Sequence, residues 1–148
     1  MPSPELEQLK RSTQTEYVAP KVARRWLDGG AIVWFSIEAV DRAVIDAWGR
    51  AAEEAIMNWP ADRPFLTVQD FSNCEGLALT PYIRKKGEYL ASLRPDLPGR
   101  NAVILRRSVV AQAVKMFLMA MKDKRRERRL FFTPQDGIEW LKQYGRQG

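Results

Sequence analysis

The sequence predicts an α/β fold with a five-stranded, mostly parallel sheet, one antiparallel edge strand and about four helices. Two observations predict this class. Short apolar runs begin near residues 31, 65, 102 and 129, and a segment with helical periodicity follows each run. The turn signal Asp28-Gly29-Gly30 stands before the first run and predicts a hairpin. Strands that alternate with helices form a parallel sheet through right-handed crossovers, so the hairpin supplies the antiparallel edge.

The predicted hairpin covers residues 17–37. Residues 17–27 alternate loosely between apolar and polar side chains, as one half-buried strand would. The run 31–37 is apolar on both faces of a strand, which indicates a central position covered by helices. Three further strands are predicted at 65–71, 102–105 and 130–132.

Four helices are predicted, and each begins after a residue that can cap it. The helices begin near 41, 80, 108 and 133, and their caps are Asp41, Thr80, Ser108 and Thr133. The first helix extends to about residue 59, the second to about residue 93, and the third covers 109–127. In two of the helices a proline follows the threonine cap, which is typical of the first helical position.

The composition predicts one domain. The chain has 148 residues, of which 45% are apolar, and this is enough for a single core. Residues 1–15 are polar and lack an apolar period, so we expect a flexible tail followed by one domain over 16–148. No apolar run approaches the ~20 residues of a membrane helix. The first residues show no secretion signal, and we therefore expect a cytoplasmic protein.

The residue types argue against catalysis. Histidine is absent, and Cys74 is the single cysteine of the chain. These two facts exclude Ser-His-Asp and Cys-His nucleophiles, histidine-ligated metals, intrachain disulfides and cysteine clusters for zinc. The glycine-rich motifs that bind dinucleotides or triphosphates are also absent from the sequence. We therefore expect no enzymatic activity, no cofactor and no metal ion.

Three segments carry a family resemblance. They are the hairpin with Asp28-Gly29-Gly30, the strand 66–72 with its aspartate Asp70, and the strand 130–132 that leads into the helix sequence Gly137-Ile138-Glu139-Trp140-Leu141. Over about 16–147 the chain resembles the STAS and SpoIIAA-like group, small βα domains that include bacterial anti-sigma-factor antagonists. The resemblance implies a non-enzymatic regulatory or protein-interaction module with a protein partner, and a cytoplasmic, bacterial setting.

The resemblance also implies candidate phosphorylation sites. In the antagonists, a serine in an Asp-Ser-Ser-Gly-like motif opens the helix after the aspartate-ending strand and is phosphorylated by a partner kinase. The matching stretch here, 78–81, lacks the motif, and only Thr80 could stand in for the hydroxyl. Ser72, directly after the aspartate-ending strand, is the second candidate. A phosphate at a helix N-terminus is electrostatically favourable. The plainer interpretation, which we favour, is that Thr80 only caps the helix.

Polar residues follow the predicted strands. Because ligands bind beyond the carboxyl ends of parallel strands, these residues are candidates for binding a small ligand such as an anion. They are Asp70, Ser72, Asn73, Thr80, Arg106, Arg107 and Ser108. The alternative is that they are ordinary turn and capping residues, and we favour it.

A basic run occupies residues 122–129. It contains six basic and two acidic side chains, and the basic ones are Lys122, Lys124, Arg125, Arg126, Arg128 and Arg129. Such a run favours binding to nucleic acid or to anionic lipid, which is our alternative function. The plainer interpretation is a solvated C-terminus of the helix 109–127, whose cations complement the helix dipole.

The predicted third helix is apolar around most of its circumference. Over 109–121, Gln112 and Lys115 are the only strongly polar residues. The surplus of apolar surface at Met116, Met119 and Ala120 favours a second buried surface, made by a second subunit in a homodimer or by an acyl chain. The alternative is that the first and last helices flank this helix and cover both sides.

Overall fold

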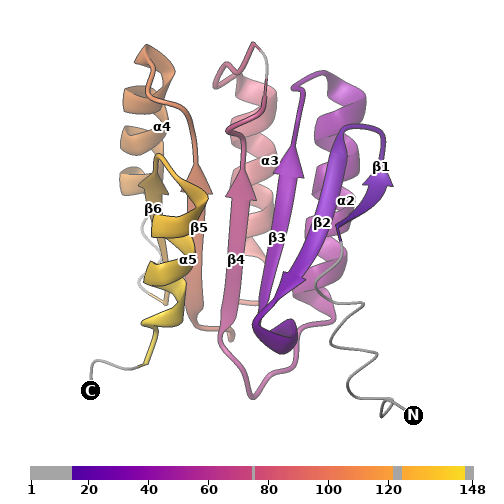
Figure 1. Ribbon diagram of the computed structural model, residues 1–148, viewed down its shortest axis with the longest axis vertical. Coiled ribbons are helices and arrows are strands. Elements are labelled where there is room, and N and C mark those ends of the chain that lie inside the picture. The colour runs from indigo at the N-terminus through magenta and orange to yellow at the C-terminus, as the bar shows by residue number, and fades with distance from the viewer. Residues whose placement is uncertain (1–14, 75, 122–124, 146–148) are drawn as a thin grey trace.

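The computed structural model describes residues 15–74, 76–121 and 125–145. Its elements, in chain order, are β1 (Glu16–Ala19), β2 (Val22–Leu27), the 3-10 turn η1 (Asp28–Gly30), β3 (Ile32–Ile37), α2 (Arg42–Met57), β4 (Phe65–Asp70), α3 (Pro81–Ser92), β5 (Gly99–Ile104), α4 (Val109–Ala120), β6 (Arg126–Phe131) and α5 (Pro134–Lys142) (Figure 1). The predicted tail over 1–15 lies outside the described residues except for Thr15.

One sheet contains six strands in the order β1-β2-β3-β4-β5-β6. The pairs β1–β2 and β2–β3 are antiparallel, and the pairs from β3 to β6 are parallel. This confirms the α/β class and the mostly parallel sheet with an antiparallel edge. Each strand pairs with its neighbour in the sequence, so the strand order has no reversal point of the kind where many α/β proteins bind ligands.

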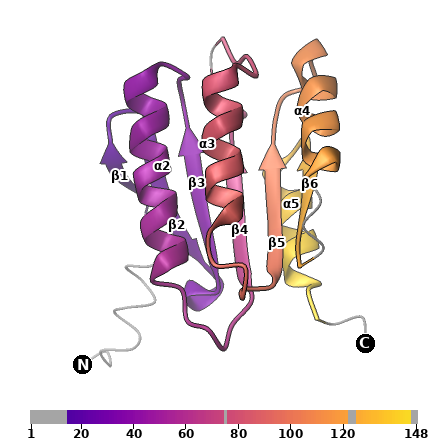
Figure 2. The same cartoon turned by 180° about the vertical axis from the view of Figure 1, so that it is seen from behind.

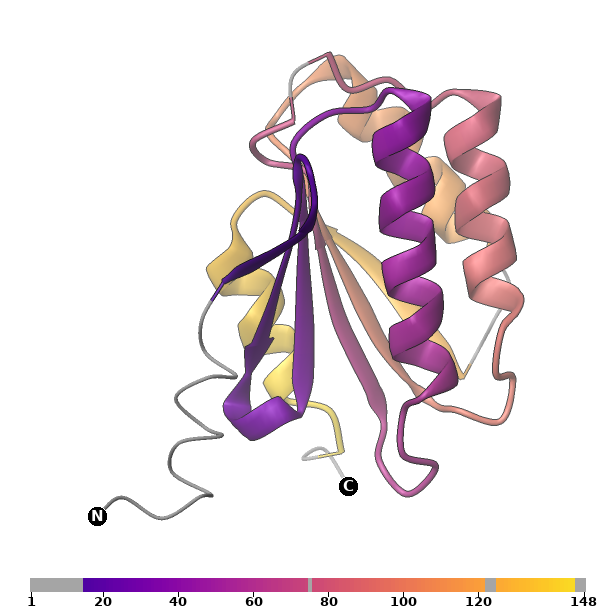
Figure 3. The same ribbon diagram turned by 90° about the vertical axis from the view of Figure 1, so that its right-hand side faces the viewer.

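Helices cover the two faces of the sheet unequally. α2, α3 and α4 lie on one face, and α5 lies on the other (Figures 2 and 3). α5 contacts β4, β5 and β6 most, and Ile32 of β3 belongs to the same buried apolar cluster as Trp140 and Leu141 of α5. In the described part of the chain no helix is long and apolar enough to span a membrane.

The predicted caps hold at three helices. Asp41 accepts a hydrogen bond from the Val44 amide (3.0 Å), and Thr80 accepts one from the Ile83 amide (3.2 Å). Thr133 caps α5 in the same way. The Ser108 side chain makes no capping bond at α4, although that helix begins where expected.

The prediction of five strands is wrong, because residues 16–27 form two strands. The turn at Pro20-Lys21 separates β1 from β2, and Lys21 has a φ of 65°. A left-handed backbone angle interrupts the extended conformation of a strand, and proline donates no ladder hydrogen bond. The loose alternation over 17–27 comes from two short strands whose polar residues are partnered across the edge, as in the Arg24–Glu16 ion pair.

The predicted C-terminal end of the helix 109–127 is also wrong. α4 stops at Ala120, and Met121 has extended backbone angles (φ −75°, ψ 107°). The basic run reaches into β6, which begins at Arg126 rather than at residue 130. β6 is an edge strand of the sheet, and charged side chains are a common protection for such edges. The interpretation of the run as a solvated helix end therefore fails for the described residues.

Candidate functional site

The carboxyl ends of the parallel strands meet at the upper edge of the sheet in Figure 1. There the structure brings three predicted site residues together. The Ser72 amide donates to Asp70 Oδ1 (2.9 Å), and Arg106 Nε donates to the Ser72 carbonyl oxygen. Asp70 is only 3% exposed. These bonds tie the loop after β4 to the loop after β5, and they use the Asp70 carboxylate, the Arg106 guanidinium and the backbone of Ser72.

The other predicted site residues have separate surroundings. Thr80 caps α3 from the opposite end of the β4–α3 loop. The Arg107 guanidinium lies 4.3 Å from the centre of the Phe132 ring, and Ser108 is exposed at the start of α4. The seven predicted residues therefore do not form one pocket.

Asp70 and Asn73 border a polar cleft of about 170 Å³. Tyr17, Arg25, Trp34 and Glu38 also line it. Tyr17 donates a hydrogen bond to Glu38 Oε1 (2.8 Å), and this bond raises the pKa of the tyrosine. The cleft thus combines acidic and basic groups on the half of the sheet that α5 leaves uncovered.

A second, mostly apolar pocket of about 130 Å³ lies between the sheet and its three covering helices. We call it the interhelix pocket. Its walls are apolar side chains from the three helices, including Trp48, Ile83, Val114, Phe117 and Leu118. Its floor is the sheet, where Thr67, Gln69, Asn101, Arg126 and Arg128 line it from β4, β5 and β6.

The floor of the interhelix pocket is unusually polar for a sheet face under helices. Thr67 pairs in register with Asn101, and Asn101 pairs with Arg128, so these three side chains form a row across β4, β5 and β6. Strands of parallel sheets that are buried on both faces are normally almost wholly apolar. The row therefore carries more polar groups than packing requires.

Hydrogen bonds satisfy only part of this floor. Trp48 Nε1 donates to Gln69 Oε1 (2.7 Å), and Gln69 Nε2 donates to Thr67 Oγ1 (2.9 Å). Asn101 Oδ1 is buried and accepts no hydrogen bond in the described structure. Since a buried polar atom without a partner is costly, this amide is the part of the floor that most needs a further partner.

The arginines of the basic run are largely part of the fold. Arg126 is 4% exposed, and its guanidinium donates to four backbone carbonyl oxygens, those of Ala91 (2.7 Å), Leu93 (2.7 Å), Arg94 (2.6 Å) and Leu97 (3.4 Å). These carbonyls lie at the C-terminus of α3 and in the loop that follows. Arg126 therefore does not belong to an exposed patch, which corrects the prediction for this residue.

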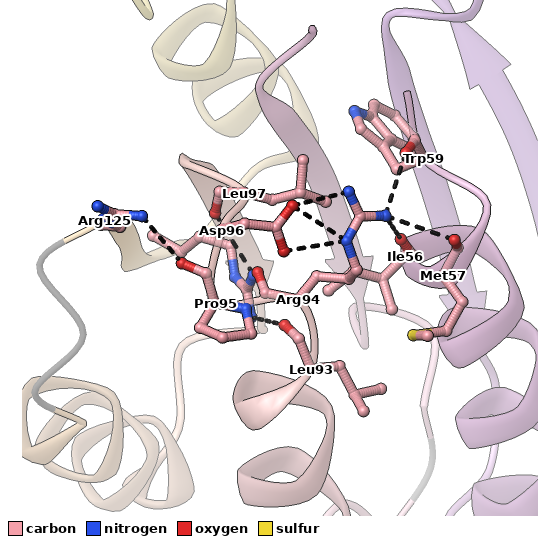
Figure 4. A network of polar contacts seen from close by, with 10 residues as sticks. Ile56, Met57, Trp59, Leu93, Arg94, Pro95, Asp96, Leu97 and Arg125 are labelled. Atoms are coloured by element: carbon pink, nitrogen blue, oxygen red, sulfur yellow. Dashed lines mark hydrogen bonds and ion pairs between the residues drawn. The ribbon is translucent and has the colours of Figure 1, made fainter. Parts of the chain in front are cut away.

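Arg94 makes the matching connection to α2. Its Nη1 donates to the carbonyl oxygens of Ile56 and Trp59, both at 3.2 Å, and its other nitrogens bind Asp96 (Figure 4). The hydrogen bond from Arg94 lowers the pKa of Asp96. Arg125 Nη1 donates to the Pro95 carbonyl oxygen (3.2 Å) in the same loop. We call these contacts, with those of Arg126, the arginine network.

The rest of the basic run is divided between the two sides of β6. Arg128 lines the interhelix pocket, whereas Arg129 lies 5.0 Å from the Trp140 ring of α5 and pairs with Glu127 at 3.1 Å. Lys122 and Lys124 lie outside the described residues. Binding of nucleic acid or anionic lipid stays a prediction, and among the described residues Arg125 and Arg129 are its exposed members.

One helix has a strongly exposed apolar face. Val109, Met116 and Met119 of α4 are 91%, 71% and 75% exposed, while Ala111, Val114 and Leu118 on the opposite side of the helix are buried. We call these three exposed residues, Val109, Met116 and Met119, the α4 stripe. This placement agrees with the surplus of apolar surface in the sequence.

The fold and these surfaces define an α/β protein with a pocket between the sheet and its helices and with an exposed apolar helix face. Comparisons of the chain with protein-family models, with curated proteins and with solved structures give no match. The resemblance to the STAS and SpoIIAA-like group therefore stays a prediction. Within the described residues, no group of three or more histidine, cysteine, aspartate or glutamate side chains is placed to hold a metal ion.

Sequence reasoning missed the interhelix pocket, although a signal for it was present. In the strand 65–71, Thr67 and Gln69 are polar and stand two residues apart, so they share one face. A strand that is packed between helices normally carries apolar side chains on both faces, so two polar side chains on one face indicate something other than packing. The same holds for Asn101, which stands two residues before Val103 on the neighbouring strand.

We expect the replacement of Thr80 by alanine to lower the free energy of unfolding by about 1 kcal/mol, because the Ile83 amide loses its acceptor. Thr80→Ser keeps the hydroxyl and is the control. Urea denaturation measures both variants. An unchanged stability in Thr80→Ala would contradict the capping role, and a lost partner interaction in Thr80→Glu at unchanged stability would instead favour a phosphorylation switch.

Proposed function

We propose that this protein is a non-enzymatic regulatory module of the STAS-like kind that works by binding another protein chain through the α4 stripe. The observation that carries the proposal is the exposure of Val109, Met116 and Met119 on one face of α4. Exposed apolar side chains that gather on one helix face mark interaction sites, and here Gln112 is a polar residue between Val109 and Met116 on the same face. Methionine suits such a site because its flexible side chain adapts to the shape of a partner.

The family part of the proposal rests on the elements that carry the resemblance. Asp70 ends β4, and Gly137, Trp140 and Leu141 lie buried on α5. The strands follow each other in sequence order, with a helix after each parallel strand. This arrangement supports a regulatory βα domain.

A second copy of the chain is the partner that the position of α4 favours. α4 is the last helix of its layer and contacts β6, the edge strand of the sheet (Figure 2). A two-fold axis beside α4 would place the same stripe of both copies face to face, which is the usual arrangement in homodimers. The helical layer would then continue from one protomer into its partner.

We expect the double variant Met116→Glu and Met119→Glu to be monomeric, whereas the unmodified chain is a dimer. The new glutamates of one protomer would then face the same glutamates of its partner across the two-fold axis. Burying like charges in an interface is unfavourable. Size-exclusion chromatography with light scattering measures the subunit count over a range of concentrations.

The control is the double variant Gln135→Glu and Gln143→Glu, which adds the same charge at two exposed positions, one in α5 and one directly after it. It should remain dimeric. Circular dichroism and thermal unfolding should show that both double variants keep the fold, since the side chains at all four positions are exposed. A monomeric unmodified chain at every concentration would refute the second copy as partner.

A further inference from the structure

We propose that the interhelix pocket binds a small aromatic molecule that carries one hydroxyl group. This site is separate from the α4 stripe, which lies on the outer face of the same helix. Ligand binding in this pocket therefore does not depend on dimer formation, and the two proposals are tested separately. Its three supports are the size of the pocket, the rings and the glycine in its walls, and the unpaired amide in its floor.

The size of the pocket sets the size of the ligand. Its volume is about 130 Å³. An apolar cavity of about 150 Å³ lined by leucine, isoleucine and phenylalanine is known to take up benzene. A single six-membered ring with one small substituent therefore fits this volume.

The walls favour a flat ring. Trp48 and Phe71 meet edge to face, with ring centres 5.9 Å apart and an angle of 75° between the rings. Phe117 approaches from α4 on the other side of the pocket. Aromatic rings attract a further ring in offset or edge-to-face geometry, so a ligand ring gains contacts here that an aliphatic ring of equal size would not.

Gly87 of α3 keeps this wall open. A Cβ atom at this position would lie 3.7 Å from the Phe117 ring, so an alanine fits, but a longer side chain would enter the pocket. Glycine inside a helix is unfavourable relative to alanine. Its presence at a pocket wall is therefore consistent with a need for space rather than for helix stability.

The floor supplies the hydrogen bonds for a hydroxyl group. Asn101 Oδ1 is buried without a donor, and Thr67 Oγ1 accepts a hydrogen bond from Gln69. A threonine hydroxyl also carries one proton that it can donate. Thr67 and Asn101 are register partners on β4 and β5. The terminal torsion of asparagine is broad, so the amide can turn its oxygen toward a ligand.

A hydroxyl group is the one small substituent that both accepts and donates. It can accept from Thr67 and donate to Asn101 Oδ1 at the same time. A hydrocarbon leaves both groups unpaired, and a carboxylate cannot donate to the amide oxygen. The two guanidinium groups that line the floor are held by the fold: Arg126 donates to four backbone carbonyl oxygens, and Arg128 Nη1 donates to the Arg126 carbonyl oxygen. The chemistry of the floor thus selects a phenol over toluene or benzoate.

The test compares four probes of similar size: phenol, toluene, cyclohexanol and benzoate. Titrations followed by amide NMR spectra of the full chain should show saturable shifts at Gly87, Asn101 and Phe117 with phenol. Phenol should bind about tenfold more tightly than toluene, which is the gain expected from one net hydrogen bond. Tightest binding by benzoate, equal binding of phenol and toluene, or no shifts with any probe would overturn the proposal.

Two variants locate the ligand. Asn101→Leu removes the amide at similar volume, so it should weaken phenol about tenfold and leave toluene unchanged. Gly87→Leu should abolish the binding of both, whereas Gly87→Ala, the matched control, should retain it. If Asn101→Leu does not fold, Thr67→Val removes the other hydrogen-bonding group and should give the same selective loss. Loss of toluene and phenol alike in either floor variant would contradict the role of the hydroxyl.

Discussion

Replacing Arg126 with methionine will lower the free energy of unfolding by about 3–5 kcal/mol. Arg126 is buried, and its guanidinium donates to four carbonyl oxygens at the end of α3 and in the following loop. Methionine fills much of the same space but donates no hydrogen bond. The carbonyl oxygens, which lie in part-buried or buried surroundings, would then lose this donor, and β6 would lose these hydrogen bonds to α3 and its following loop. Equilibrium unfolding in urea gives the free energy.

Arg129 provides the control on the same strand. Its side chain is 52% exposed and pairs with Glu127 at the surface. Because an exposed ion pair contributes little, we expect Arg129→Met to cost no more than about 1 kcal/mol. Arg126→Lys should fall close to Arg126→Met, since one ammonium group cannot reach carbonyls on four sides. Equal effects of Arg126→Met and Arg129→Met would show that the arginine network does not stabilise the fold.

The contrast between these two arginines explains why the sequence misled us about the basic run. Counting charge along the chain treats Arg126 and Arg129 alike, as parts of one solvated segment. In the fold they lie on opposite faces of one strand, because side chains alternate along a strand. The acceptors of Arg126 stand some thirty residues earlier in the chain, at Ala91 to Leu97, and no local pattern connects them with it.

The elements that local signals control were predicted well. Asp41, Thr80 and Thr133 cap helices where their patterns predicted, and the turn at Asp28–Gly30 joins β2 to β3. Caps and turns depend on a few adjacent residues, which the sequence displays directly. The extra edge strand was missed because its signal, Pro20 followed by a left-handed Lys21, lies within a stretch with strand-like composition.

The candidate site was predictable only in part. The sequence places Asp70, Ser72 and Arg106 at the strand ends, and the structure brings them together. Their mutual hydrogen bonds, however, make this edge a set of joined loops. The interhelix pocket depends on how far the helices stand from the sheet, and that distance follows from the packing of side chains on α2, α3 and α4 rather than from any motif.

Replacing Gly99 with alanine will destabilise the protein by about 3 kcal/mol or more. A Cβ atom at Gly99 would lie 1.9 Å from the carbonyl oxygen of Phe65 and 2.7 Å from its carbonyl carbon. Both atoms belong to the backbone of β4, so no side chain can move aside to make room. The start of β5 would have to move away from β4.

That movement would break further bonds at the same end of the sheet. The Phe65 amide donates to the Pro98 carbonyl oxygen (2.8 Å), and the Gly99 amide donates to the Arg125 carbonyl oxygen (2.9 Å). Gly99 also pairs in register with Arg126. A displaced β5 therefore disturbs its contacts with both neighbouring strands and draws β6 away from the arginine network.

Gly87→Ala is the matched glycine substitution, and we expect it to change the stability in the opposite direction. It lies inside α3, where the added Cβ makes an ordinary 3.7 Å contact with Phe117, so we expect it to stabilise the protein by up to about 1 kcal/mol. Thermal unfolding and urea denaturation of both variants measure the difference. If Gly99→Ala were as stable as the unmodified chain, the close approach of β5 to Phe65 would not be a property of the folded protein in solution, and the register that aligns Thr67 with Asn101 would lose its support.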